Sequence, residues 1–408
     1  MIETLKNITL SDAHQQNSLQ RALEIGVPSM KNEEWKYTYY NKILQQGFDV
    51  NNLSTKQATF NHDQIQTFIE NNSVSSNKLV FVDGIFQNDL STFLNHPKIN
   101  FWNNKNSVES NSKDFLLELN NALTTDGVFL EIGDNVIVED LVEIFYLHTN
   151  SSSIFNLKNK IKIGKNTQAK FAEYFINYNQ QSAYNNIVTE VNIDASANIE
   201  WYKIQDGGNS YNITDNMFIQ QAEKSICNVV TCSFSGAITR NVLNIDVNGE
   251  RTETHMNGLV LLLNNEHVDN RTQINHNVPN CESFELYKNI LAGTSTGVFN
   301  GKINVDAIAQ KTNAFQSNRN ILLSNDANIY TKPQLEIYAD DVKCSHGATS
   351  SQIEDSELFY LQTRGISKAT ARGLLVFAFG EEIVDKINFE PLRNKLEKRI
   401  AELLNIDL

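Results

Sequence analysis

Cysteine is scarce in this sequence of 408 residues, and its occurrences follow no regular spacing. The thiols are those of Cys227, Cys232, Cys281 and Cys344. Small secreted domains that depend on disulfides carry far more cysteines per residue. The sequence therefore predicts reduced thiols and favours a cytoplasmic location.

Basic charge and long apolar runs are also lacking. Lysine and arginine total 34 against 48 aspartates and glutamates, which gives a net charge of −14. Nucleic acids and anionic membranes bind basic surfaces, so neither is an expected partner. The longest aliphatic run, Leu259 to Leu263, is far shorter than the roughly 18 residues of a membrane-spanning helix. The N-terminus, residues 1–6, has no long apolar region of the kind that a secretory signal carries, so no secretory signal is expected.

Asparagine is frequent up to Asn328 and then absent until Asn388. Because asparagine favours turns, the first part of the chain is expected to be rich in turns, with a boundary near residues 330–350. We predict three regions: a mainly helical region over 1–127, a β core over 128–349 and a helical region over 350–408. In the first region, Trp35 and Tyr37 are expected to be packing anchors.

Short runs of alternating apolar residues fill the central region, for example Leu243, Ile245 and Val247. They recur at spacings of roughly 13–16 residues, as short strands in an all-β array do. Periodicity alone leaves a sandwich, a barrel and a solenoid open. A β region of this length favours the solenoid, in which each turn buries its face on the next.

The last region predicts three helices, beginning near Asp355, Ser367 and Pro391. The second carries an apolar stripe that includes Leu374, Leu375, Phe379 and Ile383. Two amphipathic helices at a chain end are expected to need a partner, because a polar solenoid tip offers little to bury them.

Several candidate sites have plainer interpretations. The segment from Gly297 to Ile303 has only three residues between its glycines and lacks the Ser or Thr of a P-loop, so the glycines are expected at solenoid corners. His267 and His276 match no zinc spacing with Cys281 and are expected to be structural. Cys227 and Cys232 are five residues apart, so on one strand they are expected to face opposite sides as core residues.

Residues 333–349 carry the densest chemistry in the chain. Asp340, Asp341, Cys344 and His346 fall within seven residues after an alternating, strand-like run. On an extended backbone Cys344 and His346 project to one side, where a thiolate and an imidazole suit a soft or borderline metal, or sulfur chemistry. Two ligands do not complete a metal site, so the fold or a second chain must supply the others.

This segment, continued as Leu358-Phe359-Tyr360-Leu361 and Arg364-Gly365-Ile366, resembles the C-terminal signature of the SufB/SufD family. Members are scaffold subunits of the Suf iron–sulfur cluster assembly machine. The resemblance is strong over residues 281–387. The length of the chain, the Trp35 motif and the lack of an N-terminal cysteine cluster favour the SufD branch.

The resemblance implies a right-handed parallel β-helix that pairs with a SufB-type paralogue. A SufC-type ATPase would dock on the C-terminal helices through Leu374, Leu375, Phe379 and Ile383 and hydrolyse ATP, so the chain itself would not be an enzyme. A homodimer is the alternative assembly when the paralogue is absent.

The resemblance also places Cys344 and His346 at the interface where a nascent cluster forms. Glu336, Asp340 or Asp341 would orient the imidazole, and Cys281 is an alternative sulfur carrier. No tightly bound cofactor is expected in the isolated chain; iron or an Fe–S cluster would be transient, formed with the partner. A reduced flavin is associated with such complexes, although the sequence has no flavin motif.

Two alternatives stay open. A β-helical carbohydrate-active enzyme would use Asp340 or Asp341 and line a groove with acids and aromatic residues on consecutive turns. A purely structural partner subunit would bury Cys344 and His346 away from any interface.

Overall fold

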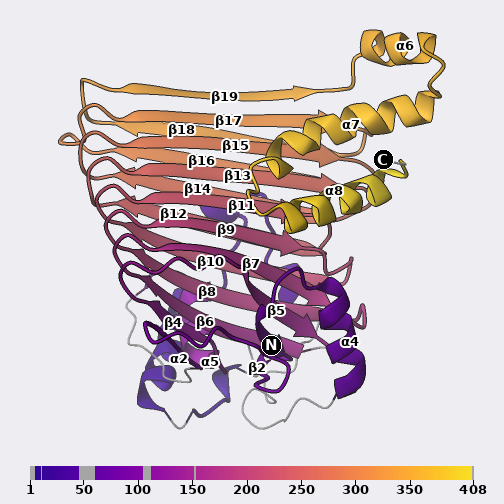
Figure 1. Cartoon of the computed structure of the whole chain (residues 1–408). Helices are drawn as coiled ribbons and strands as arrows, with labels where there is room; N and C mark the ends of the chain where they lie inside the picture. Colours follow the sequence, from indigo (N-terminus) through magenta and orange to yellow (C-terminus); the bar gives the residue numbers. More distant parts are fainter. Residues whose placement is uncertain (1–4, 11, 46–59, 104–111, 151–152, 407–408) are drawn as a thin grey trace.

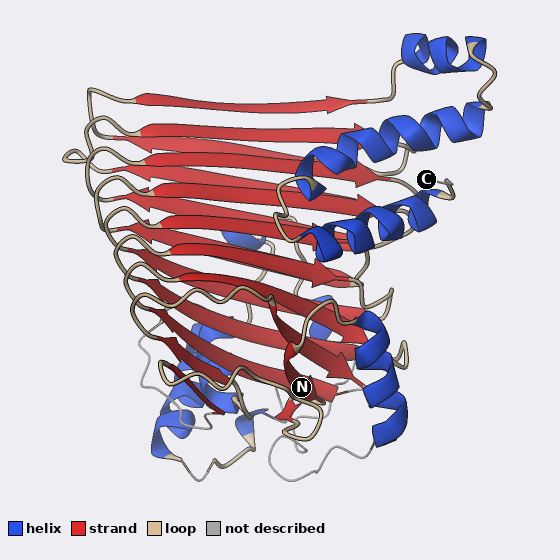
Figure 2. Ribbon diagram, viewed as in Figure 1, coloured by secondary structure: helices blue, strands red, loops and turns tan. Residues whose placement is uncertain are grey.

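The computed structural model describes residues 5–10, 12–45, 60–103, 112–150 and 153–406. A parallel β-solenoid of about eight turns forms its body, with helices beside the first turns and across one face of the later ones (Figures 1 and 2). From β4 onward the chain alternates between two sheets, and each strand pairs in parallel with the strand two positions later. The predicted β-helix with helical regions at both ends is confirmed.

The first sheet contains ten strands: β1 (Asn77–Val82), β2 (Ile85–Phe86), β5 (Val142–His148), β7 (Gln168–Asn177), β9 (Asn198–Gln205), β11 (Ile226–Ser233), β13 (Glu253–Leu262), β15 (Glu282–Leu291), β17 (Asn313–Leu322) and β19 (Lys343–Ser351). The second contains nine: β3 (Ile99–Asn103), β4 (Val128–Ile132), β6 (Ser153–Ile163), β8 (Ala183–Ile193), β10 (Tyr211–Gln221), β12 (Ile238–Val247), β14 (His267–His276), β16 (Thr296–Val305) and β18 (Asn328–Ile337). Strands β1, β2 and β3 precede residue 128, so the N-terminal region extends both sheets.

A repeated turn explains part of the asparagine content. At one corner of successive turns a non-glycine residue adopts a left-handed backbone, as Asn135, Asn166 and Asn280 do with φ of 59°, 53° and 63°. The N–H of Asn166 donates to the carbonyl of Ala195 on the next turn at 3.0 Å. Asparagine tolerates this backbone better than most residues, so the corners stack with little strain.

Both faces of many strands are buried. The lumen between the sheets holds the main apolar core and also a charged group, in which Lys203 Nζ lies 2.6 Å from Asp215 and 3.4 Å from Glu173. Helices α2 (Ala13–Ile25), α3 (Asn41–Leu44) and α5 (Phe115–Leu123), with Trp35 in the short helix η1 (Glu33–Trp35), cover the outer face of the second sheet. The expected anchoring role of Trp35 is confirmed, because it is buried there against the guanidinium of Arg240.

The outer face of the first sheet is covered by α4 (His62–Asn72), α7 (Lys368–Val384) and α8 (Glu390–Leu404). Leu259, Leu261 and Ile290 supply apolar area from the sheet, and α7 lies across β13 and β15 (Figure 1). The expectation that the last helices need a partner for burial is therefore wrong. They bury their apolar stripes against the flank of the solenoid, which is apolar, and not against its tip.

Candidate functional site

The last turn of the solenoid is open. Strand β18 pairs with β16 and β19 pairs with β17, and among the strands that the structure describes neither has a partner at its other edge. Every residue of β19 except Cys344 is exposed. Figure 1 shows β19 as the terminal strand of the stack, leading into the outlying helix α6 (Asp355–Thr363).

Cys344 and His346 face the mouth of the lumen from this open turn. Cys344 is in register with Ala314, and His346 with Gln316, and both partners on β17 are buried. Because alternate residues of a strand share a face, the thiol and the imidazole point to the lumen side. Cys344 is half-buried against the lumen core, and this burial raises the pKa of its thiol. His346 is exposed, so the pair lies at the boundary between the core and solvent.

The three carboxylates expected near the imidazole lie elsewhere. Glu336 is on the outer side of β18, where it is 2.8 Å from Lys302. Asp341 lies 3.2 Å from Lys311, and Asp340 is exposed beside it. In the described part of the chain no hydrogen bond or ion pair joins any of them to His346. Their predicted role in orienting the imidazole has no contact to support it.

A complete metal site is not formed by the described residues, among which no group of three His, Cys, Asp or Glu side chains is placed to hold an ion. Cys344 and His346 offer two donors. Iron–sulfur clusters take four protein ligands in their usual forms. The remaining ligands must come from outside the described chain if this pair is to hold a cluster.

The other three cysteines are buried. Cys227 belongs to the lumen core and Cys232 to the core under the C-terminal helices, so their predicted opposite orientation is confirmed. Burial raises the pKa of each of these two thiols to about 12. Cys281 also lies in the lumen core, where its S–H donates to the carbonyls of Pro279 and Gly249 at 3.3 and 3.4 Å. A sulfur-carrying role for Cys281 would need a route into the lumen.

His267 and His276 have structural partners, as expected. His276 Nε2 is 2.9 Å from the hydroxyl of Ser283, and His267 Nε2 is 3.0 Å from that of Thr38. Burial lowers the pKa of both imidazoles to about 4, which keeps them neutral near pH 7.

The residues expected to dock an ATPase lie mainly in the chain's own core. Ile383 is fully buried, while Leu374 and Phe379 pack against the same apolar cluster and Leu375 is half-buried. Helix α6 is different, because Phe359 and Tyr360 are 68% and 58% exposed on it. Among the described C-terminal helices, α6 therefore presents the most exposed aromatic side chains to a partner.

Gly297 and Gly301 lie inside strand β16, so their predicted place at solenoid corners is wrong. A Cβ on Gly301 would come within 2.2 Å of the side-chain nitrogen of Gln316. Glycine is needed there for close approach within the lumen, not for a turn. The extended backbone also excludes a phosphate-binding loop at this segment, as expected.

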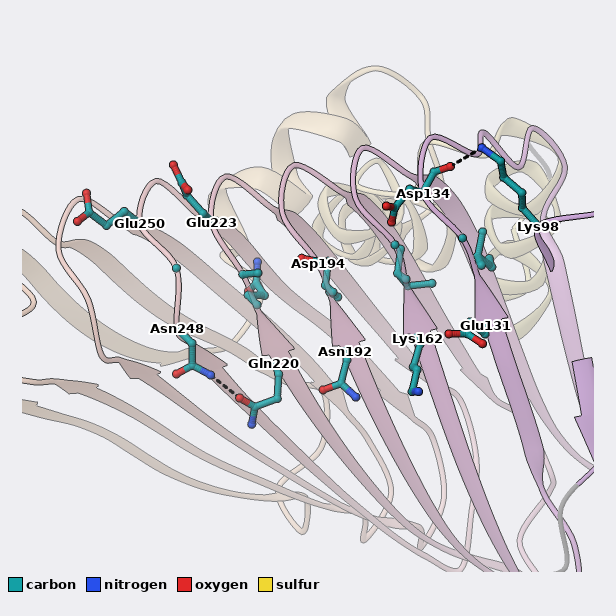
Figure 3. Close-up of a pocket in the computed structure, with 18 of the residues that line it drawn as sticks. Lys98, Glu131, Asp134, Lys162, Asn192, Asp194, Gln220, Glu223, Asn248 and Glu250 are labelled. Carbon is teal, nitrogen blue, oxygen red and sulfur yellow. Dashed lines mark hydrogen bonds between the residues drawn. The ribbon is translucent and has the colours of Figure 1, made fainter. Parts of the chain in front are cut away.

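A long groove follows the corner of the second sheet, far from the open end. Carboxylates project from several of its turns, among them Asp134, Asp194, Glu223 and Glu250 (Figure 3). None of the described residues that line the groove is aromatic, and Asp340 and Asp341 do not belong to it. Acids and aromatic residues on consecutive turns beside Asp340 were the mark of a carbohydrate-active enzyme, so that alternative is not supported.

Two lumen residues near the open end escaped prediction. Gln316 and Glu285 are buried on the inner face of β17 and β15, in the same column as His346. In β17 the buried inward positions carry polar Gln316, Asn318 and Asn320, whereas the outward Phe315 is apolar and 39% exposed, so apolar alternation does not identify the lumen face. A polar residue that faces inward therefore has the same signature as one that faces outward.

Fold and site together define a β-solenoid protein whose last turn carries a thiol and an imidazole and is covered by none of the described strands. Comparison with known protein families agrees with this class. The SufBD core domain of the SUF system for FeS cluster assembly matches residues 145–379, and the SufBD N-terminal region matches residues 4–144. The chain belongs to the SufB/SufD family of iron–sulfur cluster assembly proteins.

The similarity to individual relatives extends over most of the chain. The iron–sulfur cluster assembly protein SufD of Escherichia coli is 28% identical over 95% of this chain and 92% of its own length. A SufBD family protein of Synechocystis is 29% identical over 92% and 87% of the two chains. SufD of Bacillus subtilis is 26% identical over 69% and 65%. None of the described helices is long and apolar enough to cross a bilayer.

Proposed function

We propose that this chain is a SufD-type scaffold subunit of a cytoplasmic Suf complex, and that its open end pairs with a SufB-type paralogue. A nascent cluster then forms at the interface, with Cys344 and His346 as two of its ligands. The observation that carries the proposal is the position of this pair on an edge strand that no described strand covers.

Unpaired edge strands are normally short, charged or covered, because they invite pairing with another chain. β19 has nine residues, and Lys343 is its one charged side chain apart from the titratable His346. A paralogue whose own last turn is open would continue both sheets and close the lumen. It would also supply the ligands that the pair lacks. A second copy of this chain offers the same edges, so we propose a homodimer when the paralogue is absent.

The ATPase partner is proposed to dock on α6 and the exposed side of α7, and to perform the ATP hydrolysis. Exposed aromatic residues such as Phe359 and Tyr360 are typical of interface anchors. Phe359→Asp should weaken binding of the ATPase by at least tenfold in a calorimetric titration and leave the melting temperature unchanged. Gln362→Asp, on the same helix and also exposed, serves as the control. Equal affinity in both variants would remove α6 from the docking surface.

The cluster role is tested by co-expressing the three subunits and measuring iron bound to the reconstituted complex. His346→Ala should preserve assembly, seen by native mass spectrometry, and lose most of the bound iron. Ser345→Ala is the matched control, because Ser345 neighbours His346 but points to the other face of the strand. Iron content unchanged by His346→Ala would refute the ligand role.

A further inference from the structure

The lumen beneath His346 holds a buried carboxylate that is reached through one amide. His346 is in register with Gln316, and Gln316 with Glu285, so the three form one column on β19, β17 and β15. Gln316 is 3% exposed and Glu285 is 4% exposed. Side chains of register partners on adjacent strands are within reach of each other.

Hydrogen bonds fix the inner part of this column. Nε2 of Gln316 donates to Oε2 of Glu285 at 2.7 Å, and the hydroxyl of Thr272 donates to Oε1 of the same carboxylate. Gly301 leaves the space that the Gln316 amide occupies. Oε1 of Gln316 is buried and has no hydrogen-bond partner in the described part of the protein. One end of the amide is therefore bound to the carboxylate and the other end is unused.

No charged group of the described chain compensates Glu285. The surrounding strands bring Met256 from β13, Thr272 from β14 and Gln316 from β17. The titratable group that interacts with it is the phenol of Tyr287, two residues along β15, whose pKa is raised by burial and by this carboxylate. Burial without a cation raises the pKa of Glu285 to about 7.

We propose that Gln316 orients the imidazole of His346 when the ring folds over the lumen, and that the proton on Glu285 sets which end of the amide the ring meets. The proposal deepens the function proposed above, since it assumes that His346 is a ligand. It assigns to Gln316 and Glu285 the positioning role that the sequence suggested for Glu336, Asp340 or Asp341.

The two states follow from hydrogen-bond chemistry. With Glu285 ionised, Nε2 of Gln316 donates to it and the amide oxygen faces His346. That oxygen accepts an N–H of the ring, which leaves the lone pair of the other nitrogen for a metal. With Glu285 protonated, its O–H donates to the amide oxygen, the amide turns over, and Nε2 faces the ring. An N–H donor there competes with a metal for the lone pair of the ring nitrogen. Protonation of Glu285 therefore lowers the affinity of His346 for a metal.

The tautomer of His346 tests the orientation directly in the full-length chain. The chain is labelled with ¹⁵N-histidine, the His346 signals are assigned with His346→Ala, and the ring nitrogen shifts are read at pH 8, above the pKa of about 7 of Glu285. We expect one dominant tautomer in the wild type and the mixture of a free imidazole in Gln316→Met, a substitution of similar size. The same tautomer populations in both would overturn the proposal.

The switch is read from the side-chain amide of Gln316 in a chain labelled with ¹⁵N-glutamine. Its shift should change with a midpoint near pH 7 in the wild type and stay constant in Glu285→Gln. Glu282→Gln, an exposed position on the same strand, should behave like the wild type. Persistence of the pH response in Glu285→Gln would refute the role of Glu285, and circular dichroism confirms that each variant is folded.

Failure of this inference is separable from failure of the proposed function. If the His346 tautomer depends on Gln316 but the complex binds no iron, the proposed cluster function is refuted and the positioning role of Gln316 stands. If the complex loses iron in His346→Ala but the His346 tautomer is the same with and without Gln316, the positioning role is refuted and the cluster function stands.

Discussion

Replacing Glu285 by glutamine should change how stability depends on pH. The carboxyl has an ordinary pKa of 4.5, and burial in the lumen raises the pKa to about 7 in the folded chain. Below pH 4.5 both states are protonated and the group has no effect. As pH rises from 4.5 to 7 the unfolded chain loses this proton first, so the free energy of unfolding falls, and above pH 7 the loss levels off. Each pKa unit corresponds to about 1.4 kcal/mol, which gives a loss of about 3 kcal/mol in total.

Urea denaturation at several pH values between 4.5 and 8 measures this loss. Glu285→Gln cannot ionise, so its stability relative to the wild type should rise by about 3 kcal/mol across that interval, mostly between pH 5 and 7. The difference between two nearly isosteric chains cancels the other titrating groups. Glu282→Gln, exposed on the same strand, should run parallel to the wild type. A difference between Glu285→Gln and the wild type that does not change with pH would refute the reasoning.

Three further outcomes are expected. Lys203→Met leaves the buried carboxylates of Glu173 and Asp215 without their cation and should lower the free energy of unfolding by about 3–5 kcal/mol in chemical denaturation; an unchanged value would mean that both carboxylates are already neutral. Asn166→Val forces a β-branched residue into the left-handed corner and should cost about 1–2 kcal/mol, with Asn166→Gly close to the wild type in thermal melts. The purified chain alone should release no phosphate from ATP, and turnover matching that of the ATPase partner would overturn the proposed division of labour.

The sequence predicts the fold well because its repeat is local. Alternating strands, asparagine-rich corners and the three helices at the end all depend on short-range patterns. Ser367 accepts from the N–H of Thr370 and Pro391 opens the last helix, as expected. The positions of α7 and α8 could not be predicted. An apolar stripe shows that a helix face is buried, but it does not show which surface covers that face.

The shared face of Cys344 and His346 was predicted from the sequence, and the residues around them were not. Two residues on one strand share a face whatever the fold, so Cys344 and His346 follow from spacing alone. Their neighbours depend on register between strands about 30 residues apart, as Gln316 and His346 are. Nearby charges such as Glu336 are close in sequence and still lie on the other side of β18, beside Lys302.

The N-terminal segment before α3 reaches the far end of the solenoid. Tyr37 stacks on Tyr330 of β18 with ring centroids 4.3 Å apart, and Glu33 pairs with Lys332 on the same strand. During synthesis, Tyr37 and Glu33 leave the ribosome long before β18 exists to receive them. A chain that ends before β18 would leave both residues without these partners. The contacts that hold the N-terminal segment against β18 therefore form only after the last turn of the solenoid has been synthesised.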